Sequence, residues 1–273
     1  PPSAAHTTRP FKTEPFVAVP WERADLDSIV SRPFGIYLHV PFCTSRCGYC
    51  DFNTYALRTF PPGPAGDPIA HWAEQLTKEL RLGAQILTDH NITPPAANTV
   101  FFGGGTPSLL GRQLPKILDV VRECFGIAPG AEITSEANPE STSPELFDCW
   151  RAGGVNRLSL GMQSSEPRVL ALLDRQHDPA RAVAAIEEAQ AAGFEHLNLD
   201  LIYGTPGETT DDVARSVDTV LATGVDHVSA YALTIEPGTA LFRKVAHGEI
   251  DPIDDDMQAD RYYQIDAALQ EAG

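Results

Sequence analysis

Six short runs of apolar or β-branched residues recur along the chain and alternate with longer stretches in which apolar positions follow a helical period. Short apolar runs predict buried strands, and a 3.6-residue period predicts amphipathic helices. The predicted strands are GIYLHV (35–40), NTVFFGG (98–104), AEITSEAN (131–138), NRLSLGMQ (156–163), HLNLDLIYG (196–204) and DHVSAYALTI (226–235). The predicted helices cover residues 68–87, 114–126, 143–154, 179–193, 210–224 and 254–273.

A strand followed by a helix, repeated in this way, is typical of parallel strands joined by right-handed crossovers. Two architectures share the pattern. An open doubly wound sheet usually carries a glycine motif after its first strand, but here cysteines follow the first strand and glycines the second. A barrel fits better because every predicted strand ends in polar or reactive residues, and barrel enzymes place their sites at that end. We therefore expect an α/β fold, a partial (β/α)6 TIM-like barrel, over residues 33–273.

The first 32 residues are rich in proline and polar residues and predict an arm lying over the barrel. The opening PPSAAHTTRP lacks the apolar core of a secretory signal. No apolar run approaches the roughly 18 to 20 residues that a membrane-spanning helix needs. These features predict a cytoplasmic protein.

The net charge and the cysteine pattern limit the functions that the chain can have. A net charge of −17 argues against a nucleic-acid surface, because that binding depends on Lys and Arg neutralising phosphates. The chain has five cysteines, an odd number, and three of them are clustered. This favours a metal or redox role in a reducing compartment over a disulfide framework.

The clustered thiols are Cys43, Cys47 and Cys50, in PFCTSRCGYCDFNTY, and Phe52 stands where a fourth cysteine would continue the pattern. Structural zinc wants four ligands, and His39 is a conceivable fourth, although strand alternation can point it elsewhere. A redox pair of thiols would not need three. An iron–sulfur cluster normally takes four thiolates, so three would leave one iron free for a small molecule. The spacing alone favours a cluster over zinc.

Further motifs accompany the cysteines in a fixed order: YLHVPFC, CGYCDFN, FFGGGTPS, EANPE, GMQS, DRQH and NLDLIYGTPGET. With them, residues 33–273 resemble the radical S-adenosylmethionine (SAM) superfamily, and within it the branch of oxygen-independent coproporphyrinogen III dehydrogenases and HemW-like heme chaperones. The resemblance implies that Cys43, Cys47 and Cys50 hold a [4Fe–4S] cluster and that SAM binds the fourth iron. An electron from the cluster then breaks a C–S bond of SAM to release a 5′-deoxyadenosyl radical.

The same resemblance implies contacts to SAM. Glycines let backbone amides approach a zwitterion, carboxylates and amides accept hydrogen bonds from hydroxyl and amino groups, and a guanidinium suits a carboxylate. The expected SAM-binding residues are Tyr37, Tyr49, Gly104, Gly105, Thr106, Glu136, Gln163, Arg175, Asp200 and Thr234. For Tyr49, stacking near the adenine and plain packing remain alternatives.

Two functions are compatible with these motifs: a heme chaperone that passes heme to client proteins, and a dehydrogenase that oxidatively decarboxylates coproporphyrinogen III. The dehydrogenases extend the motif to CxxxCxxCxC and carry a longer region before the first strand, whereas this chain has Phe52 and about 32 residues there. This favours the chaperone, with heme as cargo, heme-accepting clients and an electron donor for the cluster as partners, no nucleic acid, and membrane contact through clients left open. HemW-like proteins carry a small C-terminal domain after the barrel; the sequence reaches only Gly273, so we expect that domain to be absent here and assign no heme ligand.

Overall fold

The structure is a computed structural model that describes residues 28–29, 31–60 and 67–273. Its main strands are β1 (Gly35–Val40), β4 (Ala97–Gly104), β5 (Ile127–Ala137), β6 (Arg157–Gln163), β7 (His196–Tyr203) and β8 (His227–Ala232). The α-helices are α2 (Pro68–Asp89), α3 (Gln113–Cys124), α4 (Pro144–Gly153), α5 (Pro167–Leu172), α6 (Pro179–Ala191), α7 (Thr210–Ala222), α8 (Ala240–Ala246) and α9 (Asp255–Ala272). Two-residue strands β2 (Phe42–Cys43) and β3 (Tyr55–Ala56) and the 3-10 turns Leu57–Thr59, Pro107–Leu110 and Pro139–Ser141 complete the list.

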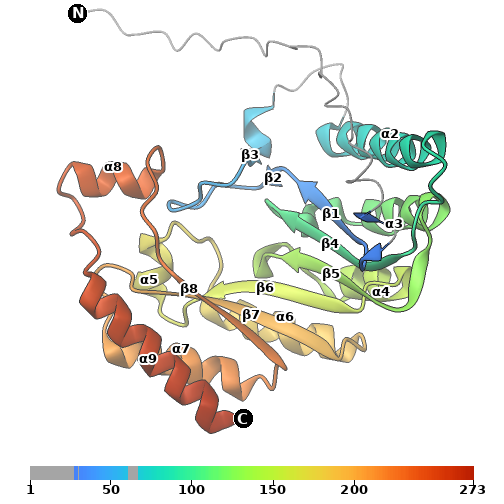
Figure 1. Cartoon of the computed structure of the whole chain (residues 1–273). Coiled ribbons are helices and arrows are strands. Elements are labelled where there is room, and N and C mark those ends of the chain that lie inside the picture. Colours follow the sequence, from blue (N-terminus) through green and yellow to red (C-terminus); the bar gives the residue numbers. More distant parts are fainter. Residues whose placement is uncertain (1–27, 30, 61–66) are drawn as a thin grey trace, which may run out of the picture.

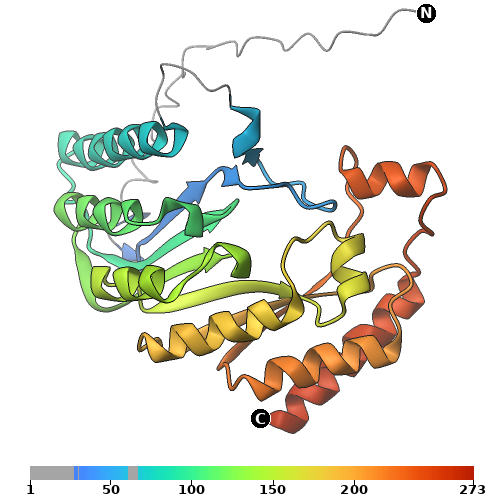
Figure 2. The same ribbon diagram turned by 180° about the vertical axis from the view of Figure 1, so that it is seen from behind.

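The six main strands form one parallel sheet in the order β1-β4-β5-β6-β7-β8, which confirms the predicted α/β fold. The sheet is curved, and β1 and β8 are its two edges, so the barrel is open (Figure 1). Seen from behind, the long helices cover the outer side of the sheet (Figure 2). The carboxyl ends of parallel strands lie at one edge, so the segments that follow them share one end of the barrel.

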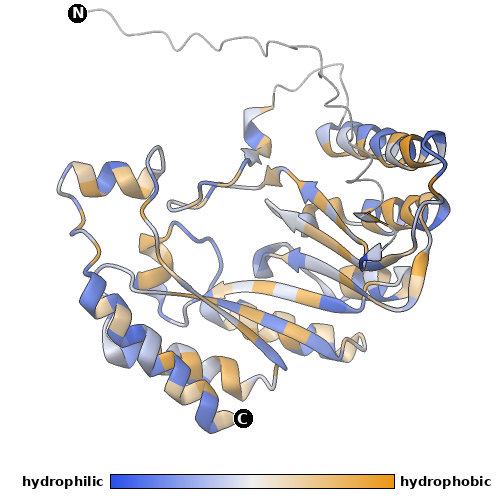
Figure 3. Ribbon diagram, in the orientation of Figure 1, coloured by the Kyte–Doolittle hydropathy of each residue, from blue (hydrophilic) through white to orange (hydrophobic). Residues whose placement is uncertain are grey.

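The core lies between the sheet and these helices. Its largest fully buried side chains include Trp150, Phe102 and Phe147, and the Trp150 indole donates a hydrogen bond to the Gly111 carbonyl at 2.9 Å. Hydrophobic and hydrophilic residues are interleaved along the covering helices α2 and α9 (Figure 3). Helix α2 is apolar on one side and buries Ala73, Leu80 and Leu87, which explains why the periodicity predicted its position, whereas α9 buries only Ile265.

The predicted elements are all present, with shifts at their ends. The third strand begins earlier than expected, at Ile127, and the sixth ends at Ala232 rather than at residue 235. β8 pairs with β7 alone within the described part of the sheet, and its side chains are largely exposed. An edge strand with one neighbour has fewer ladder hydrogen bonds to extend it.

Two short helices were not predicted, α5 with 6 residues and α8 with 7. Both are too short for a helical period to show in sequence. They contribute to a second, smaller apolar cluster that contains Leu173, Leu233 and Leu241, with Tyr49 packed against it. This cluster lies at the carboxyl end of the barrel and supports the cysteine loop.

Most of the predicted arm, residues 1–32, lies outside the described residues. Within the described part of the chain, no helix is long and apolar enough to cross a membrane.

Candidate cofactor site at the mouth of the barrel

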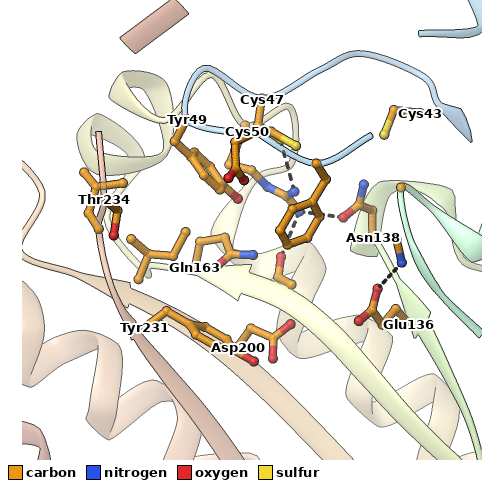
Figure 4. Close-up of a pocket in the computed structure, with 18 of the residues that line it drawn as sticks. Cys43, Cys47, Tyr49, Cys50, Glu136, Asn138, Gln163, Asp200, Tyr231 and Thr234 are labelled. Carbon is orange, nitrogen blue, oxygen red and sulfur yellow. Dashed lines mark hydrogen bonds between the residues drawn. The ribbon is translucent and has the colours of Figure 1, made fainter. Parts of the chain in front are cut away.

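A cavity of about 410 Å³ opens at the carboxyl ends of the strands (Figure 4). Small-molecule sites in proteins commonly enclose about 300 to 1,000 Å³. All of the predicted site residues line it except Tyr37 and Thr106. The topology therefore gathers side chains from the cysteine loop and from five strands around one space.

The two exceptions lie close to the cavity without lining it. Tyr37 is 58% exposed, its hydroxyl is 3.0 Å from His39 Nδ1, and the Glu136 charge helps to raise the pKa of its phenol, after the larger effect of burial. Thr106 is buried, and its hydroxyl hydrogen-bonds the Cys43 thiol and accepts a hydrogen bond from Asn138 Nδ2 at 3.1 Å. Thr106 thus orients two other residues of the site.

The cysteine loop runs from the end of β1 over the mouth. Cys43 is buried, and this burial raises the pKa of its thiol, partly offset by hydrogen bonds with Thr106 and Thr54. Cys47 and Cys50 are half-buried and lie together, with Cys43 set apart from them (Figure 4). Among the described residues, no group of three His, Cys, Asp or Glu side chains is arranged to hold a single metal ion.

His39, the conceivable fourth zinc ligand, has both ring nitrogens engaged. Nδ1 lies 3.0 Å from the Tyr37 hydroxyl, and Nε2 lies 3.0 Å from the Asn53 carbonyl oxygen. The ring therefore ties β1 to the segment after the third cysteine instead of offering a free nitrogen to the thiols.

The middle of the cysteine loop is fastened to the opposite side of the barrel. The Gly48 amide donates to the Leu173 carbonyl at 3.0 Å, and the Leu241 amide of α8 donates to the Gly48 carbonyl at 2.8 Å. A Cβ on Gly48 would lie 2.5 Å from an Asp174 carboxylate oxygen, so only glycine fits there without a shift. Lys244 of α8 pairs with Asp174 at 3.2 Å and closes this attachment.

Tyr49 contributes an apolar anchor to the same attachment. It packs against the smaller apolar cluster, and burial raises the pKa of its phenol. It also lines the cavity, so packing and contact with a ligand are compatible roles for different faces of one ring.

Arg175 is the buried cation of the site, with its side chain only 4% exposed. Its Nη2 donates to the Gly161 carbonyl at 2.9 Å and to Asn138 Oδ1 at 3.0 Å, and Nη1 donates to Cys47 Sγ at 3.5 Å. Its Nε is buried and has no hydrogen-bond partner among the described residues. An unsatisfied buried donor is costly, so an acceptor brought into the cavity would be stabilised here.

The local structure requires glycine at two positions of the GGGTP motif. Gly104 has a φ of +113°, and its amide donates to Glu136 Oε2 at 3.0 Å. The Gly105 amide donates to the Val40 carbonyl at 2.7 Å, and a Cβ there would lie 2.5 Å from the Phe42 carbonyl oxygen. Both amides are already used within the protein, so the glycines bring β4 against the cysteine loop and hold Glu136.

Two carboxylates face the cavity. Burial raises the pKa of Glu136 from 4.5 to about 7, with the nearby Asp200 charge adding to the shift and the Gly104 hydrogen bond opposing it. Asp200 lies within β7 rather than at its end, and it accepts hydrogen bonds from Asn198 Nδ2 at 2.7 Å and Ser159 Oγ at 3.3 Å. Burial raises its pKa as well. A bound cation or a hydroxyl donor would favour the charged form of both.

Gln163 closes the floor of the cavity from the end of β6. It has a φ of +67°, where the register between β6 and β7 shifts, and its buried Oε1 has no partner in the part of the chain that the structure describes. A non-glycine residue in this region is strained and is held only by its surroundings. The unpaired oxygen is therefore a second group in the cavity that lacks its hydrogen bond.

The sequence reasoning missed several lining residues. Asn138 joins Arg175 to Thr106, and its position two residues after Glu136 in the EANPE motif was the available signal. Thr234, which was predicted, does line the cavity, but beyond the end of β8 and not within the strand as expected. The other unpredicted lining residues include Ser45, Asp51, Phe52, Ser159, Gly161, Ile202, Tyr231, Leu233 and Glu236.

The sequence model of the radical SAM superfamily matches residues 37–220, most of the chain and all of the strands from β4 to β7. The chain belongs to the radical SAM superfamily. The superfamily implies a [4Fe–4S] cluster and SAM as cofactors. Arg175 and Gln163, whose buried Nε and Oε1 lack partners among the described residues, line the same cavity as the three thiols and fit such a pair, because SAM brings both hydrogen-bond donors and acceptors.

Relatives within this radical SAM superfamily share much of the sequence. Mycobacterium tuberculosis proteins named heme chaperone HemW are 54% identical over 259 residues, covering 94% of this chain and 64% of theirs. The Escherichia coli heme chaperone HemW is 35% identical over 246 residues, covering 88% of this chain and 60% of its own. The chain therefore spans less than two thirds of the length of these relatives.

Among solved structures, coproporphyrinogen III oxidase (HemN) from Escherichia coli, described as a radical SAM enzyme, superimposes with a TM-score of 0.77 at 27% identity. The match covers 93% of this chain and 56% of HemN. The open barrel described above is thus shared along nearly the whole chain.

The raised pKa of Glu136 predicts a pH-dependent stability of the cluster-free protein. Because the folded-state pKa is about 7 against 4.5, the native state binds the extra proton and stability falls as pH rises from about 4.5 to 7. Glu136→Gln removes this penalty, so the variant should gain on the order of 3 kcal/mol relative to the parent between pH 4.5 and pH 8. The measurement is urea unfolding at a series of pH values.

Glu145→Gln is the control for this experiment. Hydrogen bonds at the start of α4 lower the pKa of Glu145, so its contribution to stability has the opposite sign and is lost as pH falls. Stability curves for Glu136→Gln and the parent that stay parallel from pH 4.5 to pH 8 would contradict a buried, protonated Glu136.

The attachment of the cysteine loop predicts that α8 protects Cys47. Lys244→Met or Asp174→Asn removes the ion pair, and Asn tolerates the positive φ of position 174. The alkylation rate of Cys47 in the cluster-free protein should rise about two- to fivefold, the range of a partly exposed ion pair. Peptide mapping by mass spectrometry gives the rate for each thiol.

Lys78→Met is the matched control, because Lys78 pairs with Glu74 on the surface of α2 at 2.8 Å, far from the loop in sequence. An unchanged Cys47 rate in both Lys244→Met and Asp174→Asn would show that the ion pair does not hold the loop.

Proposed function

We propose that Cys43, Cys47 and Cys50 are the ligands of a [4Fe–4S] cluster and that SAM binds beside it in the cavity. The three thiolates would hold the cluster at the mouth of the barrel, where it would supply the electron that SAM cleavage needs. Arg175, through its unpaired Nε, receives the SAM carboxylate, and Gln163 Oε1 accepts a hydrogen bond from SAM. Glu136 and Asp200 serve its amino and hydroxyl groups, and a cation next to Glu136 would draw its pKa down from about 7.

The remaining predicted residues have supporting roles in this proposal. Tyr49, Gly104, Gly105 and Thr234 form the walls against SAM. Tyr37 and Thr106 act indirectly, through neighbouring residues. Thr106 contacts Cys43 and Asn138, and Tyr37 contacts His39.

We further propose that the whole protein is a heme chaperone, with heme as cargo and heme-accepting proteins as clients. The observation that carries this is the 54% identity, over 94% of the chain, with proteins named heme chaperone HemW. Phe52, in place of a further cysteine, agrees with it. An electron donor for the cluster and a reducing, cytoplasmic compartment belong to the same proposal, and all five cysteines of the chain are free. Residues 33–273 form the core unit.

A second candidate is the oxidative decarboxylation of coproporphyrinogen III. Its support is the structural similarity to HemN, with a TM-score of 0.77. The identity to HemN is 27%, half of that to the mycobacterial relatives.

The cluster proposal predicts the outcome of anaerobic reconstitution. Iron and sulfide should give a brown protein with about four irons per chain, and Cys43→Ala, Cys47→Ala or Cys50→Ala should each lose most of that iron. Cys124→Ala and Cys149→Ala, on helices α3 and α4, should keep it. Zinc uptake without iron would overturn the proposal.

The chaperone proposal predicts that the full-length polypeptide, with its cluster reconstituted, binds heme stoichiometrically and passes it to an apo-hemoprotein. Heme titration and transfer are followed by absorbance in the Soret region. Coproporphyrinogen III incubated with SAM and a reductant should remain unconsumed. Robust decarboxylation without heme binding would favour the second candidate instead.

A further inference from the structure

Two large aromatic side chains that line the cavity are exposed. Phe52 is 59% exposed and Tyr231 is 57% exposed. Neither has a part in holding the cluster or SAM in the assignments above. Scattered exposed apolar residues are ordinary, but two of them facing one cavity indicate a surface that meets another molecule.

The two rings come from opposite sides of the open barrel. Phe52 lies two residues beyond Cys50, on the loop that leaves the β1 edge, and Tyr231 lies in β8, the other edge of the sheet. Tyr231 is in register with Ile202 of β7, and both line the cavity together with Leu233. In the close-up, Tyr231 lies beside Asp200, across the cavity from Cys47 and Cys50 (Figure 4). The mouth therefore has an aromatic side chain on each flank.

The charges around the mouth favour one place for an anionic group. Asp51, Asp200 and Glu236 line the cavity and repel carboxylates, and Arg175, which also lines it, is assigned to the SAM carboxylate in the proposal above. Arg46 lies next to Phe52, because its Nη2 donates to the Phe52 carbonyl at 3.1 Å, and its side chain is on the exposed part of the loop. A carboxylate is thus best placed on the Phe52 side.

We propose that the rings of Phe52 and Tyr231, one on each flank of the cavity mouth, form an aromatic platform that contacts the faces of a planar, conjugated tetrapyrrole. Arg46 binds one of the carboxylates of this tetrapyrrole. This inference rests on the proposed chaperone function and names where its cargo meets the barrel. A flat aromatic face favours a flat ring, through stacking and apolar contact. A porphyrinogen has saturated meso carbons and is not flat, so the platform selects the oxidised, planar macrocycle.

Titration of heme into the full-length, cluster-loaded polypeptide tests this. Phe52→Ala and Tyr231→Ala should each weaken heme binding about three- to tenfold, the range of one aromatic contact. Tyr231→Phe should bind heme as the parent does, because the ring and not the hydroxyl makes the contact. The matched control is Tyr262→Ala, which should leave heme binding unchanged. Tyr262 is an aromatic residue of α9 that is 52% exposed and does not line the cavity.

A second pair of ligands tests the role of Arg46. Arg46→Gln should weaken the binding of heme about threefold or more and leave the binding of heme dimethyl ester, which lacks the two carboxylates, unchanged. An equal effect on both ligands would overturn this part of the proposal.

The iron content and SAM affinity of every variant show whether a loss of heme binding comes from the platform or from a general defect in the protein. If a variant to Ala loses iron, Phe52→Leu and Tyr231→Leu replace it, since leucine keeps the apolar volume and removes the flat ring. Parent-like heme affinity in both ring variants overturns the inference, as does a loss of SAM affinity with heme affinity kept. A parent protein that binds no heme overturns the chaperone proposal itself, so the two failures are distinct.

Discussion

The site depends on two backbone hydrogen bonds that fasten Gly48 to the far side of the barrel, one to Leu173 and one from Leu241. An open sheet leaves its first and last strands unpaired with each other, so nothing in the sheet brings the loop after β1 near β8. The cysteine loop makes that connection instead. It crosses the mouth, and its attachment at Gly48 decides where Cys47 lies relative to Arg175. The Asp174–Lys244 pair and the packing of Tyr49 reinforce it.

The cavity beneath that loop is lined by residues with buried polar atoms that lack hydrogen-bond partners among the described residues. Arg175 Nε and Gln163 Oε1 are buried and have no partners within residues 28–29, 31–60 and 67–273, and burial raises the pKa values of Glu136 and Asp200. Each of these groups costs stability in the absence of a ligand. A zwitterionic, hydroxyl-bearing ligand would relieve them together, which is the physical basis for placing SAM there. Preorganised polar groups of this kind lower the free-energy cost of binding.

Within one cavity, the proposed cofactor groups and the proposed cargo contacts come from different residues. The thiols, the guanidinium and the carboxylates surround the cofactor space, and Phe52 and Tyr231 flank its opening. Phe52 follows the cysteine motif directly and lines the cavity, so in the proposal one residue of this loop serves the cargo while the cysteines before it serve the cluster. In the proposed arrangement the cofactor lies inside the cavity and the cargo at its opening, between the two edges of the open sheet.

Much of the fold and most of the site were predictable because local pattern carries them. Strand and helix periods gave the order of elements, and the spacing of Cys43, Cys47 and Cys50 with the accompanying motifs predicted an iron–sulfur and SAM site. The roles of α5 and α8 were not predictable, since six or seven residues carry no helical period and their contacts are distant in sequence. Only the tertiary structure placed Leu241 against Gly48, used the glycine amides for Val40 and Glu136, and brought Tyr231 to the mouth. Residue types and spacings determine which chemistry the chain can support, whereas long-range packing decides which groups remain free to perform it.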